Sequence, residues 1–482
     1  MTVEETFREG FALQSRGDLA PALACYERVI AAHPGHFDAL HLAAVLCSQI
    51  GQKGRGLELF DQALAIVPDS AACHGNKGVA LQELGRRTEA LESFERALAL
   101  APTHADAHYN RGNTLHFMRQ FEQAIASHDR AVALQPGYTS AWANRGVSLQ
   151  ALGRCDEALA SYARAIAIDA DHLDAHWNRA LCQLLSGDLV NGWRNYEWRW
   201  KVEKVGFLHR RNFAQPLWLG QTPLSGKTLL VHAEQGLGDT LQFCRHLRQV
   251  VRLGARVVFE VPRALWGVLA PLSSFVHPVL RGCELPAFDL HCPLLSLPHA
   301  LGIDLSSIPL PDSAIKADPG RVQFWRDRLG KPVRPRIGLA WGGSQAGEVD
   351  DTRSVALAEL VQHLPRGFDY VSLQKEITPA DRDAFNAHGG IRHPGADFVD
   401  AAALCEVLDL VVSVDTSIAH LAGTLGRPVW VLLPRVPDWR WMLDRPDSPW
   451  YPTARLWRQA RQDDWAEVLE RVAAALRLQF SV

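Results

Sequence analysis

The chain has 482 residues with a formal net charge of −3, and 47% of its residues are hydrophobic against 21% that are charged. This length exceeds that of one ordinary domain, and the composition excludes a disordered chain. The near-neutral charge excludes a strongly basic nucleic-acid-binding surface, and no run of Lys and Arg indicates a partner on an anionic membrane.

The cysteines and the apolar stretches bear on compartment and cofactors. The nine cysteines are odd in number and form no CxxC pair, so we expect neither a disulfide framework nor a zinc site. The start, MTVEETFREG, is acidic and has no apolar core, so we expect no secretory signal. No stretch approaches the roughly 18 consecutive apolar residues of a membrane span. We therefore predict a cytoplasmic protein without a membrane span, a metal or another cofactor.

Residues 1–201 repeat with a period of 34. A mid-repeat glycine recurs, with Arg119 replacing it once, at Gly17, Gly51, Gly85, Gly153 and Gly187. An aromatic ring follows nine residues later, at Tyr26, Phe60, Phe94, His128, Tyr162 and Tyr196. Repeats one to four close with a helix-stopping proline, at Pro34, Pro68, Pro102 and Pro136. This pattern resembles the tetratricopeptide repeat, and the resemblance implies an α-solenoid of six stacked helical hairpins.

Asparagine recurs with the same period. By phase, four asparagines lie on the first helix of a hairpin, at Asn76, Asn110, Asn144 and Asn178. In the tetratricopeptide family this helix lines the concave groove, and an amide both donates and accepts, so such a ladder can grip a peptide backbone. The alternative is that these amides bond within the fold. Arg8 and Leu42 hold the position in the first two repeats, so any ladder is partial.

The last repeat is unusually aromatic, with Trp193, Tyr196, Trp198 and Trp200 in close succession. Such rings can stack on a sugar or base. The alternative, which we favour, is that they seal the open end of the solenoid against the next domain. Residues 202–226 are punctuated by Pro and Gly and are interpreted as a junction.

From residue 227 the pattern alternates strand, turn and helix, which predicts an α/β region with parallel sheets. We expect two domains, at 227–330 and 331–482, separated by a Pro-rich break. Strands are predicted near 228–232, 255–261, 288–291, 336–343, 368–375, 408–415 and 428–434. Ligands of such folds bind at the carboxyl ends of the strands.

The first of these strands leads into the sequence GLGDTLQF at 236–243. Candidate residues of this turn are Gln235, Gly236, Gly238, Asp239 and Thr240. The G-x-G-D string lacks the third glycine and the downstream acid of a dinucleotide fingerprint, so we do not expect a nicotinamide site. Asp239 opens a helix, and its structural alternative is therefore an N-cap.

Polar residues also follow the strands of the second domain. They are Trp341, Gly342, Arg353, Gln374, Lys375, Asp415, Thr416, Ser417 and, on the following helix, His420. A phosphate needs backbone N–H donors, hydroxyls and cations, and these loops can supply all three. We interpret them as a nucleotide-phosphate site. Asp351, on the same loop as Arg353, is a further polar candidate.

Two motifs carry a resemblance to known enzymes. GLGDTLQF resembles the opening motif of the bacterial heptosyltransferases, the family-9 glycosyltransferases, and SVDTSIAHLAGTLGRPV (413–429) resembles their donor-binding motif. The likeness covers about residues 227–480 and implies the GT-B architecture of two Rossmann-like domains, acceptor domain first and nucleotide-sugar domain second. Repeats fused ahead of such a pair resemble the O-linked N-acetylglucosamine transferases of family 41, which use an Asn ladder for protein acceptors.

The resemblance implies a role for several residues. Asp239 matches the proposed general base, whereas Thr416 and Ser417 match the phosphate-binding helix start, and Asp415 and His420 match motif positions. Further matches to phosphate-contacting lysines, the second looser than the first, are Arg353 and Lys375. Ser417 stands where the family has glycine, which narrows the space beside the phosphates. Such enzymes need no metal for this leaving group, consistent with the missing DxD motif.

The remaining aromatic patch lies at 437–452, with Trp439, Trp441, Trp450 and Tyr451 and the charged residues Arg440, Asp444 and Asp447. It either covers a base or sugar or locks a final loop onto its domain, and we favour the second. An amphipathic helix is expected at 463–479, and in GT-B folds such a helix packs back across the domain pair.

These observations predict an inverting, metal-independent glycosyltransferase. It would move a sugar from a nucleotide-sugar to a protein or glycan acceptor recruited by the repeats. An alternative from a different class is an inactive repeat scaffold that mediates protein–protein interaction. A third possibility keeps the enzyme but gives it an envelope saccharide as acceptor.

Overall fold

The computed structural model describes residues 2–202, 211–343 and 353–481. Within these ranges the chain forms two compact units, Met1–Arg179 and Ala180–Val482. Each unit is described by itself below.

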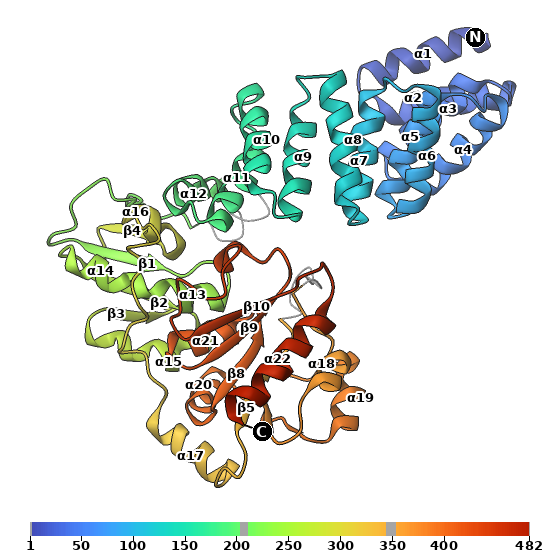
Figure 1. Cartoon of the computed structure of the whole chain (residues 1–482). Helices are drawn as coiled ribbons and strands as arrows, with labels where there is room; N and C mark the ends of the chain where they lie inside the picture. The colour runs from blue at the N-terminus through green and yellow to red at the C-terminus, as the bar shows by residue number, and fades with distance from the viewer. Residues whose placement is uncertain (1, 203–210, 344–352, 482) are drawn as a thin grey trace. The chain divides into compact units, whose positions relative to one another are not determined.

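The first unit consists of helices that pack in consecutive pairs, as Figure 1 shows. They are α1 (Val3–Ser15), α2 (Leu19–Ala32), α3 (Phe37–Gln49), α4 (Lys53–Ile66), α5 (Ala71–Glu83), α6 (Arg87–Leu100), α7 (Ala105–Phe117), α8 (Phe121–Leu134), α9 (Thr139–Ala151) and α10 (Cys155–Ile168). Helix α11 (Leu173–Ser186) crosses the boundary between the units. The predicted hairpins are confirmed.

The mid-repeat turn explains the glycine series. All five predicted glycines have a positive φ, between 74° and 89°, in the left-handed region where a Cβ is disfavoured. Arg119 takes the same conformation at φ 61° without being glycine. The turn is therefore set by the geometry of the hairpin, and the fourth repeat keeps it at an energetic cost.

A second glycine series explains how the paired helices approach. A Cβ added at Gly78, Gly112 or Gly146 would lie 2.5–2.6 Å from the ring at Phe94, His128 or Tyr162 respectively. The aromatic residue of the second helix therefore sits directly on a glycine of the first. This series also recurs every 34 residues, a signal that the sequence interpretation above did not use.

His128 is the exception among these rings. It is fully buried, and neither ring nitrogen has a hydrogen-bond partner among the described residues. Burial lowers the pKa of His128 to about 3, so the imidazole is neutral in the folded state. Tyr26 and Tyr162, which hold the same repeat position, instead donate to Gln14 and Gln150.

The second unit begins with the end of α11, then α12 (Leu189–Tyr196) and the 3₁₀ helix η1 (Glu197–Trp200). A four-stranded parallel sheet follows in the order β3-β2-β1-β4. Its strands are β1 (Thr228–His232), β2 (Arg256–Val261), β3 (His277–Leu280) and β4 (Leu290–Pro293). Helices α13 (Leu237–Phe243) and α14 (Leu247–Arg252) connect β1 to β2, with η3 (Cys244–His246) between them.

Short helices surround β3 and β4, and a longer one leads to the second sheet. They are η4 (Arg263–Leu265), α15 (Trp266–Leu269), η5 (Ala270–Ser274), η6 (Leu294–Ser296), α16 (Leu297–Ala300) and α17 (Pro319–Leu329). Helix α17 packs against a helix of the second sheet through Arg321 and Trp325, which both donate to Asp400. The helix that connects the two sheets is therefore held against the second one by side-chain hydrogen bonds.

The second sheet has six parallel strands in the order β10-β9-β8-β5-β6-β7. They are β5 (Arg336–Ala340), β6 (Asp369–Ser372), β7 (Ile391–Arg392), β8 (Leu410–Val414), β9 (Val429–Leu433) and β10 (Ala454–Arg458). The chain starts at β5, moves outward to β7, and returns to build β8 to β10 on the other side. This is a doubly wound order whose switch point lies between β5 and β8.

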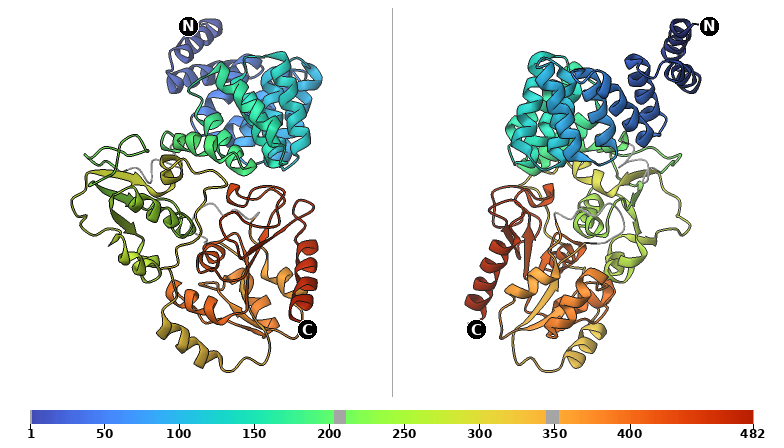
Figure 2. Two further views of the ribbon diagram at one scale, coloured as in Figure 1. Left: turned by 60° about the vertical axis from the view of Figure 1, so that its left-hand side comes forward. Right: turned by 90° about the vertical axis from the view of Figure 1, so that its right-hand side faces the viewer.

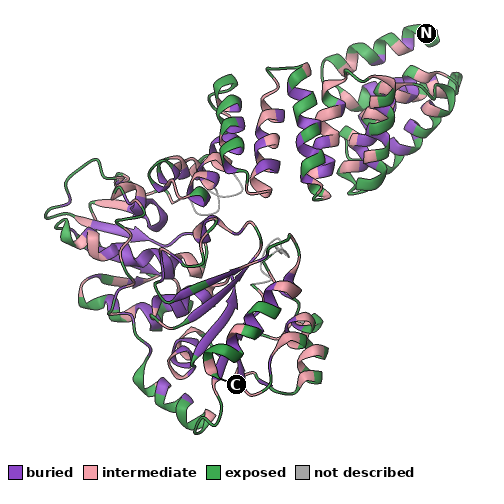
Figure 3. Cartoon of the chain, in the orientation of Figure 1, coloured by how far each residue is buried: buried purple, intermediate pink, exposed green. Residues whose placement is uncertain are grey.

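Helices cover both faces of this sheet. One layer is α18 (Leu357–His363), α19 (Pro379–His388) and α22 (Trp465–Phe480), and the other contains α20 (Phe398–Val407) and α21 (Ser417–Thr424). Figure 2 shows α22 in red along the sheet, and Figure 3 shows the strands as buried. The closing helix buries Val468, Leu469 and Val472 in the core of its own sheet, rather than crossing the domain pair as we expected.

The sequence interpretation found the main strands but not all of them. Strands β1, β2, β4, β5, β6, β8 and β9 lie where they were predicted, and β3, β7 and β10 were missed. The array and the α/β region were divided at residue 201, whereas the compact units divide after Arg179, because α12 and η1 pack on the α/β region. In the described residues no helix is long and apolar enough to cross a membrane.

Candidate functional site

The switch point of the six-stranded sheet brings two predicted loops together. Gly342 follows β5, and Asp415 and Thr416 follow β8, its neighbour in the sheet. Because all strands are parallel, these residues lie at the same edge. The edge at which doubly wound sheets bind ligands therefore carries the predicted phosphate loop.

Thr416 is the N-cap of α21. Its hydroxyl accepts from the backbone N–H of Ile418 at 3.3 Å and lies 3.1 Å from the Ser413 hydroxyl. Thr416 and Ser417 are half-buried. The first turn of this helix carries the positive end of its dipole, which favours an anion.

Asp415 is buried between two basic side chains. Its carboxylate lies 3.7 Å from Nη1 of Arg353 and 3.7 Å from Nε2 of His420. Burial by itself would raise the pKa of Asp415, but the neighbouring His420 and Arg353 outweigh it and lower the pKa. The carboxylate of Asp415 is therefore charged in the folded state. It pairs with Arg353, the cation that we predicted to bind the phosphates. Asp351, a candidate on the same loop, lies outside the described residues.

His420 is held from several sides. Its Nδ1 lies 2.9 Å from the hydroxyl of Tyr451, and its ring stacks on Trp441 with centroids 5.3 Å apart. Burial raises the pKa of Tyr451 to about 12, so this hydroxyl keeps its proton and can donate it to Nδ1. His420 is thereby fixed in position beside Asp415.

The two sequence motifs meet at His420. A Cβ added at Gly238 would lie 2.7 Å from Cδ2 of His420, so only glycine allows α13 to approach α21 this closely. One turn further along both helices, the hydroxyl of Thr424 donates to the carbonyl of Leu241 at 3.3 Å. The glycine-rich turn of the first sheet thus packs directly on the helix that follows β8.

Asp239 lies beside this contact, in the first turn of α13. The N-cap of that helix is Gly236, and Asp239 reaches back from the third position to accept from the Gly236 N–H at 2.8 Å. The N-cap alternative for Asp239 is therefore wrong in position, although the residue does cap the helix start. Its other carboxylate oxygen accepts from Arg440.

Arg440 comes from the 3₁₀ helix η7 (Trp439–Trp441). Besides Asp239 it donates to Asp438 at 2.8 Å, and its guanidinium lies 4.1 Å from the Trp439 ring centroid. Burial disfavours the charged form of Arg440, but the two carboxylates outweigh it and raise its pKa well above the ordinary value. From the sequence, Arg440 was considered only as part of a patch that could cover a base or sugar, and its pairing with Asp239 was not predicted.

The turn that holds Asp239 is anchored to the end of the repeats. Gln235 has a positive φ of 56°, and its side-chain amide donates to the hydroxyl of Tyr196 at 3.1 Å. Glu234 forms a bidentate pair with Arg199, at 2.9 and 3.0 Å, and both side chains are 1% exposed. Thr240 is buried and donates to the Gly236 carbonyl at 3.4 Å.

Both aromatic clusters are structural. Trp193 packs edge-on against Trp439 at 5.2 Å and against Phe243 at 5.6 Å. Trp441, Trp450 and Tyr451 are at most 1% exposed. Trp193 therefore packs on the α/β region, and the buried rings of the 437–452 loop are consistent with the locking role.

The loops after β5 and β6 hold the remaining predicted residues. The indole of Trp341 is 1% exposed, lies in the core and donates to Asp381 at 3.1 Å, so we no longer include this side chain among the ligand-binding candidates. Gln374 is half-buried, and its amide would lie 3.6 Å from a Cβ at Gly342. Lys375 is exposed beyond β6.

The four asparagines lie on first helices, as predicted, at α5, α7, α9 and α11. Two of them already have partners in the fold. Asn76 bonds to His41 at 2.9 Å, and Asn144 donates to Asn113 at 2.8 Å and to Tyr109 at 3.2 Å. Asn76 and Asn144 therefore support the alternative that these amides bond within the fold. The side chains of Asn110 and Asn178 are half-buried.

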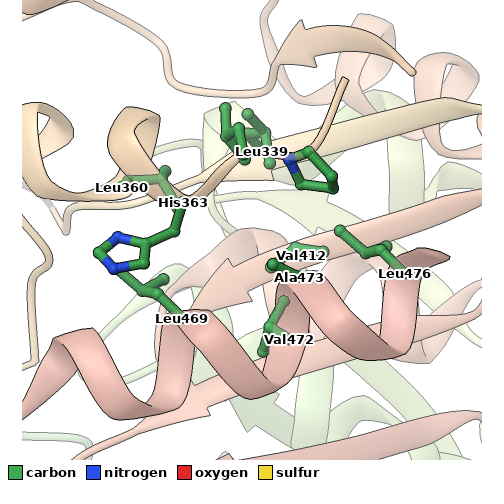
Figure 4. Close-up of a pocket in the computed structure, with 10 residues that line it drawn as sticks. Leu339, Leu360, His363, Val412, Leu469, Val472, Ala473 and Leu476 are labelled. Atoms are coloured by element: carbon green, nitrogen blue, oxygen red, sulfur yellow. The ribbon is translucent and has the colours of Figure 1, made fainter. Parts of the chain in front are cut away.

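A separate apolar pocket lies under α22. Figure 4 shows it between α22 and the strands, lined by Leu339, Val412, Leu469 and other apolar side chains with His363. None of the predicted site residues lines it. We interpret it as a packing gap in the core of the second sheet.

Comparison with known proteins identifies the repeats. One family model of the tetratricopeptide repeat matches residues 69–136. A second model of the same repeat matches residues 7–71, 112–171 and 143–191. Protein FlbA of Caulobacter vibrioides is 29% identical over 330 residues, which is 62% of this chain and 54% of FlbA. The chain thus spans about half the length of this curated relative.

Solved structures resemble parts of the chain. PilW, a type IV pilus biogenesis factor, is 23% identical with a TM-score of 0.39, over 43% of this chain and 95% of PilW. YrrB, described as a tetratricopeptide-repeat protein with an unusual peptide-binding site, is 25% identical with a TM-score of 0.32, over 38% of this chain and 93% of YrrB. The N-terminal part of this chain is a tetratricopeptide-repeat array, and an α/β region with parallel sheets follows it.

Proposed function

We propose that this protein is an inverting, metal-independent glycosyltransferase that uses a nucleotide-sugar. The observation that carries the proposal is the contact between Gly238 and His420. It brings the start of α13, with Asp239, beside the helix that opens at the switch point of the second sheet. A base and an anion site on two neighbouring parallel sheets are what transfer from a nucleotide donor requires.

The architecture supports a GT-B assignment. The second sheet has the strand order of a complete Rossmann fold, and the first sheet has the order of one Rossmann half with an added strand. In this proposal the first sheet takes the acceptor and the second takes the donor. The repeats recruit a protein acceptor, or a glycan, and Asn110 and Asn178 are the groove amides for which no internal bond is described.

The donor end is assigned to the start of α21. The N–H groups of its first turn, the hydroxyls of Thr416 and Ser417 and the guanidinium of Arg353 would bind the phosphates, with Gly342 leaving room beside them. Gln374 and Lys375 lie on the adjacent strand end and would contact the nucleotide from that side. No metal ion is needed if these groups carry the charge of the leaving nucleotide.

Asp239 is assigned as the general base. It would take the proton of the acceptor hydroxyl while the acceptor oxygen attacks the anomeric carbon from the face opposite the nucleotide, which inverts that centre. Gln235 and Gly236 fix the turn that presents this carboxylate, and Glu234 ties the turn to the last repeat.

The proposal is tested by nucleotide binding and sugar turnover with the full chain. Thr416→Val should weaken nucleotide binding by about tenfold, because a hydroxyl at the phosphate end is lost. Thr378→Val is the matched control, since Thr378 is the N-cap of α19 on the same sheet and lies outside the proposed site. Equal affinities of wild type and Thr416→Val would remove the phosphate assignment.

A scaffold without catalysis is the second candidate. The observation that favours it is that Asp239 and Arg353 are both held in internal ion pairs, with Arg440 and Asp415 respectively. Titration calorimetry separates the two: a scaffold binds no nucleotide, whereas the enzyme does. A saccharide acceptor in place of a protein is separated by acceptor screening.

A further inference from the structure

The pair formed by Asp239 and Arg440 is largely buried and lies where the two motifs meet. The two side chains are 12% and 11% exposed. Both oxygens of Asp239 are engaged, one by the Gly236 N–H and the other by Arg440. The proposed base is therefore restrained by a cation.

Arg440 lies close to the start of α21. The next residue, Trp441, stacks on His420 at 5.3 Å. The backbone N–H of His420 donates to the Thr416 carbonyl, so His420 stands one helical turn from the N-cap. The loop that carries Arg440 therefore packs against α21 one helical turn from its N-cap.

The arginines at this place already have carboxylate partners. Among the described residues, Arg440 pairs with Asp239 and Asp438, and Arg353 pairs with Asp415, which also lies beside His420. A nucleotide adds negative charge, and its phosphate would compete with these carboxylates for the guanidinium groups.

We propose that Arg440 is shared between Asp239 and the phosphate of the nucleotide, and that it is a second cation for the leaving group. This inference rests on the function proposed above. In the transfer step the acceptor hydroxyl gives its proton to Asp239, and its oxygen forms the bond to the anomeric carbon. The bond from that carbon to the phosphate oxygen breaks, and its electron pair leaves with the nucleotide. Asp239 becomes neutral as the phosphate gains charge. The hydrogen bond of Arg440 therefore shifts from the Asp239 carboxyl to the phosphate.

The platform of Arg440 fits such an exchange. Its guanidinium lies over the face of Trp439, which is 5% exposed and packed against Trp193. An arginine stacked on a fixed aromatic ring can redirect its N–H groups without leaving the ring. Five N–H donors in one plane allow it to bond a carboxylate and a phosphate together during the exchange.

The test is titration calorimetry of the full chain with the mono- and diphosphates of uridine, guanosine, adenosine and cytidine. We expect Asp239→Asn to bind the preferred nucleotide about tenfold more tightly, because Arg440 is released to the phosphate. Arg440→Gln should bind it about tenfold more weakly, and Arg440→Lys should recover part of the loss. In the Arg440→Gln background, Asp239→Asn should give no gain.

The matched control is Arg445→Gln, which breaks the pair of Arg445 with Asp447 on the same loop and should leave affinity unchanged. Circular dichroism spectra establish that each variant is folded. If Asp239→Asn raised nucleotide affinity equally with and without Arg440, the gain would come only from removing the repulsion between the Asp239 carboxylate and the phosphate. That result would overturn the proposed exchange of Arg440. Wild-type affinity in Arg440→Gln would overturn it as well, with the proposed function intact. Absence of nucleotide binding in the wild type would overturn both.

Discussion

The two compact units use charged side chains in different ways. In the repeats the ion pairs lie on the surface, as between Lys77 and Asp61, where the carboxylate side chain is 63% exposed. In the α/β unit the pairs of Arg199 with Glu234 and of Arg440 with Asp239 are buried. Surface pairs contribute little to stability, whereas a broken buried pair leaves a charge without a partner. The second unit therefore contains buried charge pairs beside its exposed ones, and one of them holds Asp239 at the candidate site.

The largest expected effect comes from breaking the buried pair between Arg199 and Glu234. Glu234→Gln removes the bidentate partner of Arg199 and leaves it only Glu197, at 2.8 Å, among the carboxylates of the described residues, so the free energy of unfolding should fall by about 3 kcal/mol, the low end for a broken buried pair. Denaturant unfolding followed by tryptophan fluorescence measures this, because many tryptophans lie in the second unit. A loss below about 1 kcal/mol would show that the buried charges do not distinguish the units.

The repeats should be most sensitive where a ring rests on a glycine. In Gly146→Ala the new methyl group would meet the Tyr162 ring at 2.5 Å, and overpacking of this kind costs about 1–3 kcal/mol. Gly75→Ala is the control, since nothing lies within 4 Å of a Cβ there and alanine favours the helix. Urea unfolding followed by circular dichroism should show opposite signs for the two variants. Equal stabilities would contradict the packing account.

Acid should weaken the repeats through His128. Its pKa falls from about 6.5 in the unfolded chain to about 3 in the folded state. The unfolded chain therefore binds more protons between these values, and stability falls as the pH is lowered through this window. Between pH 7 and pH 5 the contribution of His128 is about 2 kcal/mol. His128→Phe should remove that part of the acid sensitivity, measured as the difference between the two urea unfolding curves at each pH. An unchanged pH dependence would mean that His128 is hydrated in the folded state.

The smallest effect is expected at the surface of the repeats. Lys77→Met removes an exposed pair with Asp61 and should change the free energy of unfolding by less than about 1 kcal/mol. It is compared directly with Glu234→Gln in the same urea series. A loss as large as that of Glu234→Gln would remove the contrast between the two units.

The fold could be predicted where the information is local. The glycine at each mid-repeat turn and the ring nine residues later follow from a period that the sequence shows directly. Strands such as β5 and β8 are short apolar runs followed by turn residues, and they were recognised as such. Strand β7 has only two residues, and β3 and β10 lack a clear alternation, so their pairing depends on neighbours in the sheet.

The candidate site was predictable in its motifs but not in its partners. Asp239 and Arg440 are 201 residues apart, and nothing in either segment indicates the other. Trp341 looked like a loop residue at a strand end, yet its ring turns into the core because Asp381 accepts its N–H. Burial and pairing of this kind are set by tertiary packing, which no local pattern reports.

The most direct test of the central claim is turnover of a panel of nucleotide-sugars by the full chain, with Asp239→Asn beside the wild type. If the starts of α13 and α21 form one transfer site, the wild type consumes one of these donors and releases its nucleotide. Asp239→Asn should then lose about a hundredfold or more in rate while it still binds the nucleotide. Undiminished turnover in Asp239→Asn, or no consumption of any donor by the wild type, would contradict the account.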